Sequence, residues 1–485
     1  MKERLHPSFK DRIKSWDFFL LTYKGGDPYC YGNMLFRHRY EDDDDYAKRQ
    51  ERSYLLNYTR PVVDIYTKYI CGQPLSRLAE ADRQERFDKF KENCDGRGTK
   101  LHTFMSVVTT LTSIFGRCGV LVLGADPKQI PAIATGVVDK KVMPRLRLIR
   151  PQMLIDWARD EYGNFVWVLL KYNVYEDADP NTDRKISARY ELWTKTEWTL
   201  FKKGENTENL VVMKSAQHNL GRVPYVEFFN ADVDSDFEPE SLIEDIAIIN
   251  RTIFNYSSLL DEILYLQAFS QLTIPADQGE INQKIISTKR AFNYPKDSPY
   301  PPAYIAPDAS QAKLFIDLNA SLVSEIYRLA TLRKSGSSQT DQYSTAFGKM
   351  VDFEDTEAAL TAKANLMETS EKELADEVGL HMGMIGKPLW TPNYPKTFEV
   401  RSFTQEIQDA LSLESLMMGK TFMTKVRQKI ARRALPQETS KTFAEIDKEI
   451  EKLSASLIEL DPHAEETGGS KSPSADNPPN SETVK

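Results

Sequence analysis

Few residue patterns in this sequence have the spacing that a catalytic or phosphate-binding site needs. Gly419-Lys420-Thr421 resembles the end of a phosphate-binding loop, but such a loop needs a glycine five residues before Gly419, where Glu414 stands. The triplet also lies within a helical pattern and does not follow a buried strand. The segment 383–387 fails too, because Pro388 follows its lysine. We therefore predict no nucleotide-binding loop.

The side chains that most often bind metals or act as nucleophiles are scattered. The six histidines are His6, His38, His102, His218, His381 and His463, and the four cysteines are Cys30, Cys71, Cys94 and Cys118. They form no H-E-x-x-H or C-x-x-C pattern, and no G-x-S-x-G elbow occurs. We expect no catalytic residue, no metal site and no cofactor, hence not an enzyme. Because Asp and Glu are plentiful, a carboxylate-dependent nuclease stays as an alternative.

The densest cluster of charge is Glu41 to Asp45, five consecutive carboxylates. They lack the glycine-containing loop that orders ligands in a calcium hand. Because like charges repel each other, we predict a solvated loop within an irregular stretch, residues 1–60.

Composition limits the class of protein. The 485 residues are 41% hydrophobic, enough for a substantial core, and carry a net charge of −8. That charge argues against a broad surface that grips nucleic acid, although an acidic protein can let DNA slide past. Residues 1–14 lack the apolar region of a signal peptide, and the apolar segment 103–125 is interrupted by Arg117. We expect a soluble protein and a reducing compartment.

Residues 50–235 are predicted to form an α+β domain. Apolar spacing predicts a helix over 54–70 and two more within 77–115, separated by the turn 95–98. β-rich segments bounded by turn residues predict strands at 120–124, 144–150, 165–175, 186–194, 197–202, 209–217 and 223–229.

Helical spacing returns at Ser241, which forms an S-x-x-E capping box with Glu244 and opens a helix of roughly 30 residues. The proline-rich segment 275–311 is predicted to be a compact, mostly non-helical insertion. A second helix is predicted over 311–333 and a third near 345–379.

Between the second and third of these helices lies a short polar stretch, 334–342, without a hydrophobic residue. Most Ser/Gly stretches are flexible linkers. Because long helices flank this one and Arg333 and Lys334 lead into it, we predict a loop displayed at the edge of a channel.

The last part of the chain is predicted to be mostly helical. We expect a strand at 398–403, helices at 405–418, 421–434 and 437–459, and a disordered tail after Asp461.

The order of these elements resembles that of tailed-bacteriophage portal proteins. The stretches that resemble family text are 57–64 with the Gly72-Gln73-Pro74 turn, 116–124, 218–225, 241–245 with Asn250 and Asn255, and 398–403. Each match is short, but together they follow the family's order over roughly residues 50–460.

The resemblance implies a portal-like subunit with a mixed α/β wing, long stem helices, a small clip insertion and a helical crown. The implied parts are an N-terminal arm (1–49), the wing (50–240), stem helices (241–270 and 312–333), the clip (271–311), a tunnel loop (334–346), a long channel or wing helix (347–395), a wing strand with the crown (396–460) and a disordered tail (461–485). The residues implied to face DNA are Arg333, Lys334, Ser335, Ser337, Ser338, Gln339, Thr340 and Gln342.

The implied function is a homo-dodecameric ring at one capsid vertex, assembled in the host bacterial cytoplasm, through which DNA is packaged and ejected. The implied partners are the large terminase subunit, the major capsid and scaffold proteins, the head–tail adaptor or neck proteins, and double-stranded DNA that passes without sequence specificity, with no membrane. The alternatives are another virion structural protein, such as a head–tail adaptor or minor capsid protein, and the nuclease.

Overall fold

The computed structural model divides into two compact units, residues 1–398 and 399–485. The residues that it describes are 2–72, 75–124, 143–176, 185–204, 209–218, 220–232, 239–267, 271–276, 292–295, 297, 299, 301, 303–305, 310–331, 346–398, 407–408, 410–413, 419–434 and 440–456.

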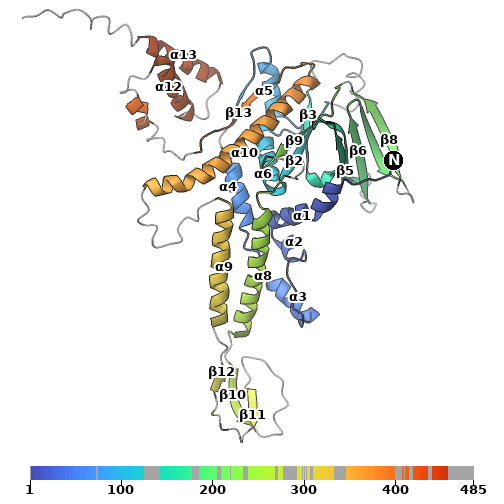
Figure 1. Cartoon of the computed structure of the whole chain (residues 1–485), viewed down its shortest axis with the longest axis vertical. Helices are drawn as coiled ribbons and strands as arrows, with labels where there is room; N and C mark the ends of the chain where they lie inside the picture. The colour runs from blue at the N-terminus through green and yellow to red at the C-terminus, as the bar shows by residue number, and fades with distance from the viewer. Residues whose placement is uncertain are drawn as a thin grey trace, which may run out of the picture. The chain divides into compact units, whose positions relative to one another are not determined.

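The first unit mixes helices and sheets (Figure 1). Its helices are α1 (Pro7–Lys24), α2 (Asp27–Cys30), α3 (Asp43–Arg52), α4 (Thr59–Cys71), α5 (Gln84–Glu92), α6 (Leu101–Phe115), the 3₁₀ turn η1 (Pro151–Met153), α8 (Glu244–Gln267), α9 (Ser310–Leu329) and α10 (Ala346–His381). Its strands are β1 (Ser76–Leu78), β2 (Arg117–Leu123), β3 (Arg145–Ile149), β4 (Leu154–Arg159), β5 (Phe165–Glu176), β6 (Lys185–Thr194), β7 (Glu197–Lys203), β8 (Leu210–Gln217), β9 (Tyr225–Phe229), β10 (Gln271–Ala276), β11 (Phe292–Pro295), β12 (Ala303–Ile305) and β13 (Thr391–Asn393).

The core is organised around a three-stranded antiparallel sheet in the order β3-β2-β9. Successive side chains of β2 point to opposite faces, so Leu121 belongs to one hydrophobic cluster and Val120 and Val122 to another. The first cluster joins α1, α6 and the five-stranded sheet β4-β5-β6-β7-β8. The second joins α4, α5, α6 and α10. The β2 strand is therefore buried on both faces, and α6 contributes to both clusters.

A glycine makes the turn from α6 into β2 possible. Gly116 has φ +84°, a conformation that L side chains rarely adopt, and a Cβ there would lie 2.2 Å from the Pro239 carbonyl oxygen. The amide of Gly116 also closes α6 by donating to the carbonyl of Thr112 at 2.8 Å. The chain that leads to α8 therefore passes directly over the end of α6.

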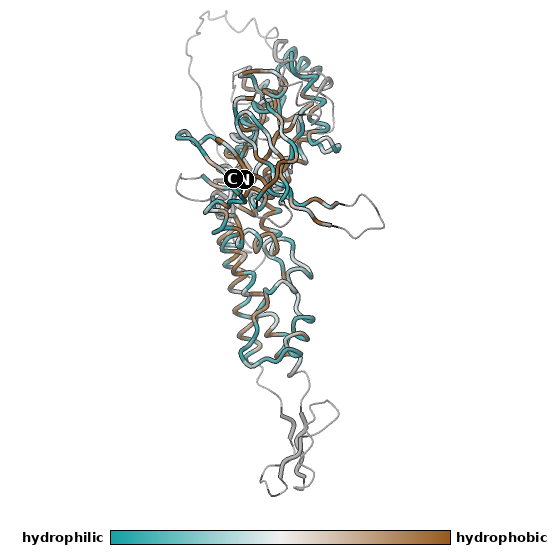
Figure 2. Tube along the Cα trace, turned by 90° about the vertical axis from the view of Figure 1, so that its right-hand side faces the viewer, coloured by the Kyte–Doolittle hydropathy of each residue, from teal (hydrophilic) through white to brown (hydrophobic). Residues whose placement is uncertain are grey.

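Helices α8 and α9 run side by side in opposite chain directions (Figure 1). The chain between them contains the small sheet β11-β10-β12, in which β10 pairs parallel to β11 and antiparallel to β12. Hydrophilic and hydrophobic residues alternate along the helix pair (Figure 2), as expected for helices that bury one stripe.

Most predicted elements within 59–229 are confirmed within a few residues. Both helices on either side of the turn 95–98 are present as α5 and α6, and the seven predicted strands correspond to β2, β3 and β5–β9. The helix expected from residue 54 begins at Thr59, because an earlier start would bring Pro61 into the helix interior. The sequence did not predict β4 or the two-stranded pair β1–β13.

The prediction that residues 1–60 are irregular is wrong, because three helices occur there. In α1 the aromatic residues Phe9, Trp16 and Phe19 are buried and pack in the first hydrophobic cluster. The helical spacing of these residues is interrupted by charged side chains, so packing against α6 and α8 stabilises the helix more than local preference does.

The prediction that Glu41–Asp45 form a loop is also wrong, although residues 42–45 are exposed to solvent as predicted. The Asp42 carboxylate caps α3 by accepting from the Asp45 amide at 2.8 Å, and the other aspartates occupy the first turn. Negative charge at a helix N-terminus is favourable because the unpaired amides and the helix dipole point there.

The predicted helices at 241–270, 311–333 and 345–379 correspond to α8, α9 and α10. The described residues of the insertion before Ser310, where α9 begins, include strands and no helix, in agreement with the sequence.

The second unit contains α12 (Lys420–Ala434) and α13 (Ser440–Ser456), which pack against each other. They confirm the helices expected at 421–434 and 437–459. Of the helix expected at 405–418, residues 407–408 and 410–413 are described and helical. Most of the strand expected at 398–403, and the tail after 461, lie outside the described residues.

Candidate functional site

The candidate functional site is the pair of helices α8 and α9. The capping box of Ser241 and Glu244 fixes the position at which α8 begins. The Glu244 carboxylate accepts from the Ser241 amide at 3.4 Å, while the Ser241 hydroxyl accepts from the Ile243 amide at 3.1 Å. Arg12 of α1 binds the same carboxylate through both nitrogens, at 2.5 and 2.8 Å. This hydrogen bonding by Arg12 lowers the pKa of Glu244. The predicted helix start is confirmed.

Two buried asparagines on α8 bind the backbone of the N-terminal segment. Asn250 accepts from the Tyr58 and Thr59 amides at 3.0 and 3.3 Å and donates to the Leu56 carbonyl at 2.8 Å. Asn255 accepts from the Phe36 amide at 2.7 Å and donates to Met34 at 3.1 Å. An amide side chain can satisfy a donor and an acceptor of one backbone segment together. The two asparagines therefore attach residues 34–59 to α8.

A buried ion pair attaches α3 to the same helix. Arg49 binds Glu41 at 2.6 and 2.7 Å and donates to the Ser258 hydroxyl of α8 at 3.3 Å. Together with a fourth hydrogen bond, to the Phe36 carbonyl at 2.8 Å, these contacts satisfy much of the guanidinium, as a buried charge requires. Nearer the end of α8, Arg52 pairs with Glu262.

The contact between α8 and α9 is partly aromatic and partly polar. The rings of Tyr256 and Phe315 lie 5.7 Å apart, and Asn319 donates to the Ser257 hydroxyl at 3.5 Å. One turn apart on α9, Leu314 and Leu318 are 67% and 39% exposed. A single chain therefore leaves apolar surface uncovered on this helix.

The end of α9 is fastened to α4 and α10. The Tyr66 hydroxyl donates to the Ala330 carbonyl at 3.0 Å and contacts the Thr331 hydroxyl at 2.7 Å. On α10, the Thr356 hydroxyl donates to the Thr331 carbonyl. Thr331 itself has φ +49°, uncommon for a residue other than glycine. Two elements, α4 and α10, thus fix the position at which the chain leaves α9.

A fully buried lysine lies where α6, α10 and the chain leading to α8 meet. Lys363 donates to the Ser113 hydroxyl and, at 2.6 Å, to the Asn230 side chain. The Ser113 carbonyl also accepts from the Leu242 amide at 3.0 Å. No carboxylate pairs with Lys363 among the residues that the structure describes, and burial lowers the pKa of its ammonium to about 7. We call Lys363, Ser113 and Asn230 the lysine junction.

The C-terminal half of α10 is held by buried charged groups. Glu371 accepts from Arg77 at 2.5 and 2.9 Å, from the Trp390 indole at 2.8 Å and from the Tyr394 hydroxyl at 2.6 Å. The satisfied carboxylate attaches α10 to β1 through Arg77 and to the residues on both sides of β13 through Trp390 and Tyr394.

One turn and a half further along α10, Glu377 binds Arg222 at 2.5 Å. Burial raises the pKa of Glu377 to about 7 and lowers that of the neighbouring His381 to about 4. Both pKa shifts favour the neutral forms of these two side chains. The ion pair with Arg222 joins α10 to the connection between β8 and β9.

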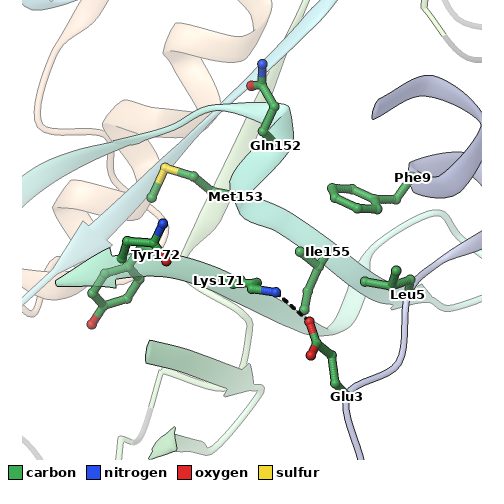
Figure 3. Close-up of a pocket in the computed structure, with 9 residues that line it drawn as sticks. Glu3, Leu5, Phe9, Gln152, Met153, Ile155, Lys171 and Tyr172 are labelled. Atoms are coloured by element: carbon green, nitrogen blue, oxygen red, sulfur yellow. Dashed lines mark hydrogen bonds and ion pairs between the residues drawn. The ribbon is translucent and has the colours of Figure 1, made fainter. Parts of the chain in front are cut away.

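A cavity of about 490 Å³ opens where residues 3–9 cross β4 and β5 (Figure 3). Apolar side chains, among them Leu5, Phe9 and Ile155, line one side, and the ion pair of Lys171 with Glu3 at 2.7 Å crosses it. The Tyr172 hydroxyl, also from the lining, donates to Glu191 at 2.7 Å, outside the set of lining residues.

The eight residues that the sequence places at the DNA channel all lie outside the described residues. These are Arg333, Lys334, Ser335, Ser337, Ser338, Gln339, Thr340 and Gln342. The structure describes their two flanks, the end of α9 and the start of α10. The sequence indicated Asn250 and Asn255 only through the family resemblance. It did not indicate the backbone groups that they bind, because those groups lie about two hundred residues away in the chain.

Within the described residues, no group of three or more His, Cys, Asp or Glu side chains is placed to hold a metal ion. Nor is any helix in that part of the chain long and apolar enough to cross a membrane. The described arrangement can act mechanically, because a firmly anchored helix pair presents a small sheet at one end.

Comparison with known families gives one match. The model of the family described as "Phage portal protein, SPP1 Gp6-like" matches residues 17–268, just over half of the chain. The matched range runs from within α1 to the end of α8. It therefore includes the sheets β3-β2-β9 and β4-β5-β6-β7-β8 and the two asparagines of α8. No curated protein matches the sequence.

Proposed function

The chain belongs to the SPP1 Gp6-like family of phage portal proteins, and we propose that its copies form a ring at one capsid vertex through which DNA is packaged and later ejected. In this proposal the ring also docks the terminase and, afterwards, the neck or tail proteins. The observation that most supports it is the α8–α9 pair with its terminal sheet, within a chain whose first half matches the family.

The proposed parts follow the order of the fold. Residues 50–240 form the wing, α8 and α9 the stem, and the sheet β11-β10-β12 the clip that meets terminase. Residues 334–346 form the tunnel loop, α10 the long channel or wing helix, and the second unit the crown. Residues 1–49, proposed as an arm, run along α8 through the contacts of Asn255 and Arg49.

The proposed mechanism is steric and electrostatic guidance. A separate ATPase, the terminase, drives the DNA, while the ring provides a conduit. Because each chain carries a net charge of −8, a ring of twelve repels the phosphate backbone and keeps DNA from adhering. The polar side chains of the tunnel loop contact the backbone weakly and without sequence preference.

Ring assembly gives the exposed apolar surface of α9 a physical role. A ring needs a heterologous interface that closes on itself, and Leu314 and Leu318 are apolar residues that a neighbouring subunit would cover. We expect negative-stain images of the purified chain to show rings with a central hole.

The variant Leu314→Glu should reduce the fraction of rings strongly, whereas Ile385→Glu should not. Ile385 is the matched control because it is 84% exposed and lies in a turn after α10. A clean monomer for the wild type, together with metal-dependent DNA cleavage, would overturn the proposed function.

A further inference from the structure

The ion pair between α10 and the β8–β9 connection joins a buried group to an accessible one. The Arg222 Nε atom lies 2.5 Å from the Oε2 atom of Glu377. The glutamate side chain is 3% exposed, whereas the arginine side chain is 48% exposed. Arg222 can therefore exchange its partner for water with little rearrangement, while the carboxyl group of Glu377 stays enclosed by protein.

The second oxygen of the same carboxyl group, Oε1, is buried and has no hydrogen-bond partner in the part of the chain that the structure describes. The Nδ1 atom of His381, one turn further along α10, lies 3.5 Å from Oε1 and 3.0 Å from the Glu377 carbonyl oxygen. Because a carbonyl oxygen only accepts, the imidazole nitrogen donates to it. Ionising a buried carboxyl group with one unsatisfied oxygen is costly, so Oε1 is a ready position for a proton.

Other ionisable groups surround this ion pair. They are His218 at the end of β8, Glu227 of β9 with its partners Arg117 and Arg159, and Glu373, Asp376 and His381 of α10. Burial lowers the pKa values of both histidines, that of His381 to about 4, so the rings add no positive charge near neutral pH. Among the described residues, Arg222 is therefore the cation that offsets an ionised Glu377.

We propose that protonation of Glu377 releases Arg222, so that the β8–β9 connection is bound to α10 in alkaline solution and loses this bond in mild acid. The connection joins the five-stranded sheet to the sheet β3-β2-β9. The bond that depends on the proton is thus one between the large sheet and the longest described helix. Burial raises the pKa of Glu377 to about 7, which places the change near neutrality.

Linkage gives the direction of the effect. A raised carboxyl pKa means that ionisation of Glu377 costs folding free energy as pH rises from 4.5 toward 7. Arg222 offsets part of this cost, so its contribution to stability exists where Glu377 is ionised. That contribution is lost as pH falls through about 7.

The test is a double-mutant cycle on the full-length chain, with melting temperatures measured by circular dichroism at about pH 5.5 and about pH 8.5. Arg222→Gln should lower the melting temperature of the wild type at the higher pH and change it little at the lower pH. In a Glu377→Gln background the same substitution should have little effect at either pH, because the amide is neutral at both.

The matched control is Lys396→Gln, which removes a cation bound at 2.8 Å to Glu368 of the same helix. Although burial opposes it, hydrogen bonding by Lys372 and Lys396 lowers the pKa of Glu368 to about 2. This carboxylate is therefore charged at both pH values, and the loss in melting temperature should be the same at both.

A cost of Arg222→Gln that is equal at the two pH values, or absent at both, would overturn the proposal. So would the same pH dependence in the Glu377→Gln background, because another group would then be the one that titrates. Glu373→Gln distinguishes the nearest candidate, whose pKa burial also raises. In that background the pH dependence should persist, and its disappearance would assign the effect to Glu373 and reject Glu377.

Discussion

At the residue scale, the most informative group is Lys363. Its ammonium has hydroxyl and amide partners but no carboxylate among the described residues, so the charged form is costly in the folded chain. The lysine junction nevertheless connects three elements that position α8. Burying this cation costs free energy, but its hydrogen bonds favour one specific arrangement of the elements that meet at the lysine junction.

The charge of Lys363 makes stability depend on pH. Burial lowers its pKa from 10.5 to about 7, so the cost is full below pH 7 and disappears as pH rises toward 10.5. Over this interval wild-type stability should rise relative to Lys363→Met, by at most about 1.4 kcal/mol per pH unit. Thermal unfolding of both proteins, followed by circular dichroism between pH 7 and 10, measures the difference.

Lys372→Met is the control for this prediction, because Lys372 lies on the same helix but is 50% exposed. Its melting temperature should follow that of the wild type across the range. Parallel curves for the wild type and Lys363→Met would show that the buried amine does not titrate as described.

At the element scale, the structure shows that the N-terminal helices are held to α8 by side chains that bind backbone. The backbone amides of residues 36, 58 and 59 all donate to asparagine oxygens. Because the amides of Phe36 and Tyr58 belong to connecting segments and that of Thr59 to the first position of α4, none of them has a partner within regular structure. The backbone of residues 34–36 and 56–59 is thus bound to α8 by two side chains.

Replacing either asparagine with alanine should release one segment and leave the other in place. Asn255→Ala leaves the Phe36 amide without its acceptor, a loss of about 1–3 kcal/mol. The hydrogen-exchange rate of the Phe36 amide should then rise about tenfold to a hundredfold, since 1.4 kcal/mol corresponds to a factor of ten.

Asn250→Ala should affect the amides of Tyr58 and Thr59 instead, so each variant is the control for the other. Hydrogen-exchange mass spectrometry distinguishes the two segments. Equal protection of residues 34–36 in wild type and Asn255→Ala would contradict the anchoring role.

At the scale of the whole molecule, the polar stretch between α9 and α10 is the part that the proposed function assigns to DNA. The two helices that flank this stretch are held by contacts outside it. Tyr66 binds the end of α9, and Lys363 attaches α10 to Asn230. The helices therefore do not need the stretch in order to hold their positions.

Deleting Ser335–Gln342 should leave ring formation intact and reduce DNA packaging or retention, because the DNA backbone loses the polar side chains that contact it in the proposed function. Negative-stain images report the rings, and a packaging assay with terminase reports the DNA. Deletion of the equally long segment 470–477 from the tail is the control and should change neither result. Loss of rings with undisturbed packaging chemistry would show that the stretch is structural.

The sequence alone determined the elements whose signals are local. The capping box at Ser241, the helical stripes of α8 and α9, the turn at 95–98 and the strand alternation depend on neighbours a few residues apart, so they can be read directly.

Tertiary structure decided everything that depends on distant partners. Helix α1 is stabilised because residues far along the chain cover its aromatic side chains, and Lys363 has its low pKa because three separate elements exclude water from it. Asn250 and Asn255 became anchors only through backbone groups about two hundred residues away. Burial and hydrogen bonding between such segments leave no periodic pattern, which is why the sequence could not reveal them.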